Sequence, residues 1–252
     1  MSTPTLRPLA LGELLDVAFT LYRELFASLV LVSVVTSGAP ALIAVYLDPT
    51  PGVAGGGNLL LSFANQILAL VMGAIGIAAS TFIVSDHYLG ESLSAGAALG
   101  RAAQFAGRLI VASFLIGLVV FCGVVLLIVP GIILACGLAV SPTALVLERL
   151  GPIEAMGRSW NLTRGYRGKV FGTLLITVFL IVLPYIALGA VSAVLIPLAG
   201  SAGVVLAGLL MVTLGVLISP FFYVALTVLY YDLRIRKEGF DLEVLANTLR
   251  PA

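Results

Sequence analysis

The chain has 252 residues, of which 61% are hydrophobic and only 10% are charged; its mean hydropathy is +1.18 and its formal net charge is +1. Because a soluble domain carries roughly 25% charged residues, this composition excludes an ordinary globular protein, a disordered chain and a disulfide-rich secreted scaffold. It also excludes most nucleic-acid binders, which cluster positive charge on a soluble surface. The composition therefore predicts an integral membrane protein.

The first helix expected along the chain is amphipathic and covers residues 8–26. Its apolar side chains recur at the helical spacing of three and four residues, at Leu11, Leu14, Leu15, Ala18, Leu21, Tyr22, Leu25 and Phe26. Polar side chains, among them Glu13, Asp16 and Arg23, take the other face. We expect such a helix to lie in the plane of the lipid headgroups, with its apolar face toward the hydrocarbon.

Six apolar stretches are each close to the length of about 20 residues that crosses a bilayer. They cover residues 25–47, 58–85, 109–129, 131–147, 170–196 and 203–231. A Gly/Pro-rich gap at 48–57, a Val129-Pro130-Gly131 turn and a link at 197–202 pair them into hairpins 25–85, 109–147 and 170–231. The sequence therefore predicts an all-α polytopic membrane protein, one integral membrane domain over 1–252 with six transmembrane helices and a tail at 239–252.

The positions of the basic residues predict the orientation of the chain in the membrane. All 13 Lys and Arg residues lie in the N-terminal segment, in the two long connectors between hairpins or in the tail. None lies in a hairpin tip, where Asp48 is the only charged residue. Under the positive-inside rule, both termini and both connectors are cytoplasmic.

The second helix of each hairpin ends in a carboxylate, at Asp86, Glu148 and Asp232. A unit of one connector and one hairpin, used three times, explains this pattern and predicts a pseudo-threefold repeat. One interpretation is a ring of carboxylates at the inner mouth of a cavity, which binds cations or relays protons. The other is that each carboxylate pairs with a connector arginine and fixes that connector to the bundle.

A cluster of basic residues surrounds the single tryptophan, Trp160, in the second long connector. It consists of Arg158, Arg164, Arg167 and Lys169. These side chains are candidates for contacts with anionic lipid headgroups, which are worth about 1 kcal/mol per basic residue near the surface. The alternative is that the cluster does no more than set the topology.

Cofactor and metal sites are not expected. The chain has a single histidine, His87, which excludes mechanisms that need two imidazoles. Cys122 and Cys136 lie in apolar runs, where they are either buried filler or a disulfide pair near the outer end of one hairpin. The sequence has no P-loop, dinucleotide fingerprint or nucleophile–base set, so we do not expect an enzyme.

Three segments together resemble the membrane domain attached to some bacterial glycerophosphoryl diester phosphodiesterases, which also occurs alone. They run from Arg7 to Arg23, from Glu148 to Gly165 and from Leu229 to Glu243. The resemblance implies a six-helix protein of the bacterial plasma membrane. It does not imply phosphodiester hydrolysis, which in that family belongs to a separate soluble barrel with two catalytic histidines and acidic metal ligands.

The expected function is that of a non-catalytic membrane scaffold or accessory module, which contacts anionic phospholipid or a membrane or cytoplasmic protein partner. The alternative is a small transporter or channel with a cavity at the midplane. Its cavity would be lined by helices broken at Pro40, Pro142, Pro184 and Pro220. A polar cavity that reaches the midplane favours transport, whereas a solid bundle packed through Gly and Ala favours the scaffold.

Overall fold

A computed structural model describes residues 7–47 and 59–239, and every regular element in these ranges is helical. In chain order the elements are α1 (Leu11–Glu24), α2 (Phe26–Ser33), the π-helix η1 (Val34–Gly38), α3 (Ala39–Leu47), α4 (Leu59–Tyr88), α5 (Ala95–Ala103), α6 (Ala106–Leu126), α7 (Ile128–Leu138), α8 (Ser141–Leu147), α9 (Pro152–Thr163) and α10 (Arg167–Glu238). The prediction of an all-α fold is confirmed.

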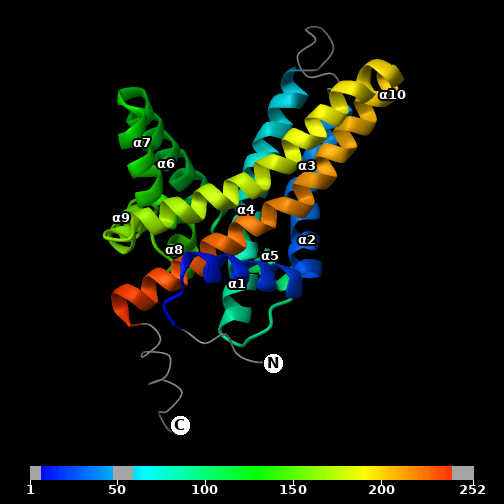
Figure 1. Ribbon diagram of the computed structural model, residues 1–252. Coiled ribbons are helices and arrows are strands. Elements are labelled where there is room, and N and C mark those ends of the chain that lie inside the picture. Colours follow the sequence, from blue (N-terminus) through cyan, green and yellow to red (C-terminus); the bar gives the residue numbers. More distant parts are fainter. Residues whose placement is uncertain (1–6, 48–58, 240–252) are drawn as a thin grey trace.

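Five helical segments are long and apolar enough to cross a membrane: Phe26–Leu47, α4, α6, Ile128–Leu147 and α10. The longest of them, α10, is two helices joined at Gly200, whose φ of 56° and ψ of −130° are not helical. Figure 1 shows α10 turning back on itself at its far end. Gly200 lies inside the link expected at 197–202. The chain turns at a glycine because only glycine adopts this backbone conformation without strain.

The turn expected at Val129-Pro130-Gly131 is misplaced by a few residues. The chain leaves the helical conformation at Leu127 (φ −164°, ψ 143°), and Pro130 lies in the first turn of α7. Proline is tolerated there because the first backbone N–H groups of a helix have no intrahelical acceptor. A Cβ on Gly131 would lie 2.3 Å from Cγ2 of Val124, so this glycine permits the close approach of α6 and α7.

The first apolar stretch is interrupted, although it covers nearly the predicted range. The π-helix η1 precedes Pro40, which lacks an amide proton and crowds the preceding helical turn. Thr36 in η1 faces Gly76 of α4, where a Cβ would lie 2.6 Å from the threonine Oγ1. The expected gap at 48–57 and nearly all of the tail at 239–252 lie outside the described residues.

The buried core lies at the end of the bundle that contains α1, α5 and α9, which we call the connector layer. Its largest fully buried side chains include Leu14, Leu29, Ile83, Leu109, Leu145, Leu162, Leu229 and Tyr230. Figure 1 shows α1 lying across this end, and α6 and α7 leaning away from the far ends of α3 and α10. The far ends of α6 and α10 expose large apolar side chains such as Phe121 and Leu198, as expected for surfaces that face hydrocarbon.

Helices continue past the apolar stretches at the connector end. The segment α4 extends to Tyr88 and α10 to Glu238, three and seven residues beyond the ranges expected from hydropathy. The reason is that the polar residues of these last turns form ion pairs, including those of Asp86 and Glu238. Hydropathy alone therefore locates the spans but not their ends.

Candidate functional site: ion pairs at the connector end

Asp232 is the most enclosed of the three carboxylates, with a side chain that has no exposed surface. Its Oδ1 accepts a hydrogen bond of 2.7 Å from the backbone N–H of Leu9, just before α1. Its Oδ2 accepts from Lys169 Nζ at the start of α10 and from Arg236 Nε at 3.0 Å.

The same two cations also bind the backbone carbonyl of Leu9. Lys169 Nζ and Arg236 Nη2 each donate to the carbonyl oxygen of Leu9, both at 2.6 Å. The entry to α1 is therefore held between the first and last turns of α10. Because a buried charge is costly unless it is paired and hydrogen-bonded, this arrangement satisfies Asp232, whose side chain has no exposed surface.

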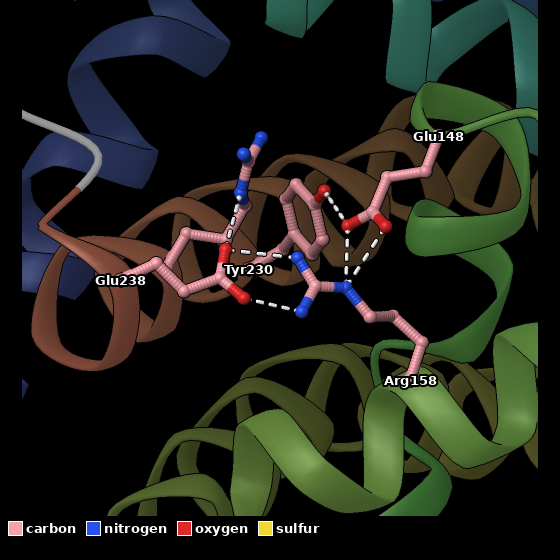
Figure 2. Close-up of polar contacts among 5 residues, drawn as sticks. Glu148, Arg158, Tyr230 and Glu238 are labelled. Atoms are coloured by element: carbon pink, nitrogen blue, oxygen red, sulfur yellow. Dashed lines mark hydrogen bonds and ion pairs between the residues drawn. The ribbon is translucent and has the colours of Figure 1, made fainter. Parts of the chain in front are cut away.

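Glu148 lies at the end of α8 and forms a second cluster, which Figure 2 shows. Arg158 Nε donates to both carboxylate oxygens of Glu148 at 2.8 Å, and the Tyr230 hydroxyl donates to Oε1 at 2.6 Å. The other two nitrogens of Arg158 bind Glu238, which also accepts from Arg234 Nε at 3.1 Å. One guanidinium thus joins the ends of α8 and α10 through α9.

The electrostatics of this cluster keep Arg158 charged. Its hydrogen bonds to Glu238, and then those to Glu148, raise the pKa of the Arg158 guanidinium above its ordinary value, while burial acts in the opposite direction. A planar guanidinium with several donors suits this bridging position better than the point charge of a lysine.

Asp86, near the end of α4, makes the most exposed of the three pairs. Its Oδ2 accepts from Arg101 Nη1 of α5 at 3.0 Å, and the Arg101 side chain is 43% exposed. The Arg101 guanidinium also lies 4.3 Å from the centre of the Phe82 ring. A second contact nearby joins α4 to α1, where His87 Nε2 lies 3.1 Å from Glu24 Oε2.

The three carboxylates share a local sequence pattern that the sequence analysis missed. A buried threonine stands five residues before each of them, at Thr81, Thr143 and Thr227. The connector helices also share a register: the positions 4, 8 and 11 residues after each N-cap are at most 4% exposed. These positions are Leu14, Ala18 and Leu21 in α1, Ala98, Ala102 and Phe105 at α5, and Ala155, Ser159 and Leu162 in α9. The threonine spacing is present in the sequence and could have been found there.

The basic cluster around Trp160 divides into two groups. Arg158 and Lys169 bind carboxylates, as described above. Arg167 instead lies over the Trp160 ring, 4.0 Å from its centre, and its Nε is buried without a hydrogen-bond partner. Arg164 is exposed and makes no ion pair with any residue that the structure describes. Of these five residues, the structure brings only Arg167 and Trp160 into contact with each other, whereas Arg158 and Lys169 bind different carboxylates. The sequence could not separate paired cations from unpaired ones.

A cavity of about 510 Å³ lies at the opposite end, between α3, α4 and α10. Its polar lining consists of Ser62, Asn65, Gln66 and Ser192. Asn65 Nδ2 donates to the Pro40 carbonyl at 3.1 Å, while its Oδ1 is buried without a partner in the described ranges. Because Asn65 precedes Asp86 by 21 positions, about 31 Å along a helix axis, the cavity and the carboxylates lie at opposite ends of α4.

Metal-ligating clusters and a disulfide are also absent from the described residues. Within residues 7–47 and 59–239, no group of three or more His, Cys, Asp or Glu side chains could hold a metal ion. Cys136 is buried, Cys122 is exposed, and both thiols are free. Of the two alternatives that the sequence left open, a disulfide between Cys122 and Cys136 is therefore not formed.

A model of an uncharacterised protein family, UPF0259, matches residues 58–231, more than half of the chain. The chain belongs to this family. Two curated relatives are UPF0259 membrane proteins, one from Pectobacterium carotovorum with 34% identity over 110 residues and one from Photorhabdus laumondii with 32% over 109. The matches cover 42% and 43% of this chain, and the chain spans 43% and 40% of those proteins. No solved structure matches the chain.

The expected membership of the phosphodiesterase-type membrane domain is wrong, because the matching family is UPF0259. The motifs that carried the resemblance have a local physical origin. Glu13 Oε2 accepts from the Ala10 amide at 2.7 Å, and Glu154 Oε2 accepts from the Gly151 amide at 2.9 Å, so both glutamates cap their own helices. A cap of this kind is a general feature of helix N-termini, so it does not identify a family.

Proposed function

We propose that this protein is a non-catalytic integral membrane scaffold or accessory module with six spans in three hairpins and a pseudo-threefold repeat. Its connector layer lies on the cytoplasmic face of the bacterial inner membrane and contacts anionic lipid or a cytoplasmic partner. The observation that carries the proposal is that all three span-ending carboxylates, Asp86, Glu148 and Asp232, are hydrogen-bonded to cations next to or within the connector layer.

Two features support the repeat. The shared buried register of α1, α5 and α9 is what three equivalent connectors require. The turn at Gly200 divides α10 into two helices, which supports six passes by the five long apolar segments. Asp232 then binds a residue just before α1, as Glu148 binds Arg158 of α9. The third unit therefore contacts the first.

Ion translocation through the carboxylates has less support. A proton or cation relay needs acidic groups that exchange partners with water, whereas Asp232 is enclosed and already accepts three hydrogen bonds. The cavity near Asn65 favours transport, but apolar side chains make up most of its lining.

A paired measurement on Asp232→Asn tests the proposal. We expect the variant to melt at a lower temperature in detergent, and we expect wild-type proteoliposomes to pass protons and monovalent cations no faster than protein-free liposomes. A flux in the wild-type that Asp232→Asn abolishes without changing the melting temperature would overturn the scaffold and support the transporter.

A further inference from the structure

We infer that the groove between α6, α7 and α9 holds an acyl chain of an anionic phospholipid, whose phosphate lies against Arg164 and Arg167. This inference rests on the proposed function, since it takes the connector layer to lie at the inner leaflet. It names the lipid class and the site, which the proposed function leaves open.

The groove is apolar and has a volume of about 500 Å³. One wall consists of leucine and valine side chains from the two long helices, namely Leu115, Val119, Leu134 and Leu138. The other wall is the apolar face of α9, formed by Ile153, Met156, Gly157 and Trp160. A groove that runs from a connector helix onto two membrane spans has the direction of a lipid chain in its leaflet.

The face of α9 that lines the groove is only partly covered by the protein. Ile153 is 76% exposed and Gly157 is exposed, whereas Met156 and Trp160 are half-buried, although α9 lies outside the apolar spans. An amphipathic helix with this geometry lies in the interface, where its apolar face meets acyl chains. Trp160 is suited to that depth, because its ring is apolar and its indole N–H is polar.

The positive charge next to the groove is unmatched. Arg167 stacks on the Trp160 ring, and its Nε is buried with no acceptor. Arg164, three residues away, forms no ion pair within the described ranges. The neighbouring cations Arg158 and Lys169 are paired with carboxylates. Arg164 and Arg167 are therefore the basic residues of this cluster that remain for an external anion.

An occupant that is apolar along its length and anionic at one end fits both halves of the site. A phospholipid with a single net negative charge, such as phosphatidylglycerol, has this chemistry and is present at high concentration in a bacterial bilayer. Arginine binds its phosphate through paired hydrogen bonds, and the chain fills a groove that would otherwise expose apolar surface.

The test compares three variants with the wild-type in nanodiscs that contain equal phosphatidylglycerol and phosphatidylcholine, with retained lipids measured by native mass spectrometry. Arg164→Gln/Arg167→Gln removes the charges. Gly157→Leu places a side chain in the groove, because Gly157 lines it. The new side chain does not clash with the protein, since a Cβ at this position meets no atom within 4 Å. Arg23→Gln/Arg149→Gln is the control, because it removes two other exposed arginines that make no ion pair within the described residues.

We expect the wild-type to retain phosphatidylglycerol in preference to phosphatidylcholine. Arg164→Gln/Arg167→Gln should bind it about 30-fold more weakly, the change that the loss of two basic contacts predicts. Gly157→Leu should lose the lipid without any change in charge, and the control should retain it. Equal losses in the control, full retention by Gly157→Leu, or equal retention of both lipids would each overturn the inference. If retention fails while Asp232→Asn still lowers the melting temperature, the lipid site is wrong and the scaffold proposal stands.

Discussion

Replacing Asp232 with asparagine removes the negative charge that two partly buried cations share. Lys169 and Arg236 keep only 14% and 24% of their side-chain surface exposed, so solvent compensates them little. Removing one partner of a buried ion pair costs about 3–5 kcal/mol. Asparagine retains an acceptor for the Leu9 amide, so we expect the lower end of this range, about 3 kcal/mol. For Asp86→Asn we expect less than about 1 kcal/mol, because the Arg101 side chain is 43% exposed and solvent compensates its charge.

The protein supplies its own probe for this comparison. Cys136 is 3% exposed, so in a Cys122→Ser background its thiol reacts with a fluorogenic maleimide only after unfolding. Melting curves in one detergent then give the two losses side by side. The same loss in Asp232→Asn and Asp86→Asn, or none in either, would refute the argument that burial sets the strength of these pairs.

Three further predictions concern α9, the contact between η1 and α4, and α1. Arg158→Lys should lower the melting temperature nearly as much as Arg158→Gln, because an ammonium group cannot bridge Glu148 and Glu238 as the guanidinium does; full rescue by lysine would contradict the bridging geometry. Gly76→Ala should cost about 1–3 kcal/mol through overlap with Thr36, and Thr36→Ala should recover part of this loss in the double variant; additive losses would count against the contact. The hydrogen bond from Arg7, followed by that from the Ala10 amide, lowers the pKa of Glu13, so its contribution to stability is present above its unfolded pKa and is lost as the pH falls through its folded pKa. Melting temperatures of Glu13→Gln between pH 6 and pH 3 should therefore fall less steeply than those of the wild-type, and parallel curves would exclude this role.

The membrane class and the approximate spans could be predicted from the sequence because hydropathy is a local property of the chain. The partners that lie far apart in the sequence could not. Leu9 and Asp232 are 223 residues apart, and Arg158 and Glu238 are 80 apart, so only the fold brings them together. Hydropathy also predicted ends for α4 and α10 that lie several residues before the observed ones. Contacts with the connector layer stabilise these last polar turns, and such contacts depend on the fold.

The carboxylates themselves were identifiable because each interrupts an apolar run, and their pairing with nearby cations was one of two open interpretations. Arg101 and Arg158 lie within 15 residues of their partners, at a separation that sequence reasoning can consider. The position of Pro130 inside α7, rather than in the turn before it, could not be predicted in this way. Its place depends on the close contact of Gly131 with Val124, which is a property of the packed hairpin.

The hydrogen bonds that hold Leu9 have a consequence for the order in which the chain assembles. The peptide that starts α1 is held by Asp232, Lys169 and Arg236, all of which belong to α10. At about 5–20 residues per second, a ribosome makes Asp232 about 10–45 s after Leu9. During that interval the amide and the carbonyl of Leu9 lack the partners that hold them in the complete structure. The entry to α1 therefore reaches its final position only after the chain has been made as far as Arg236.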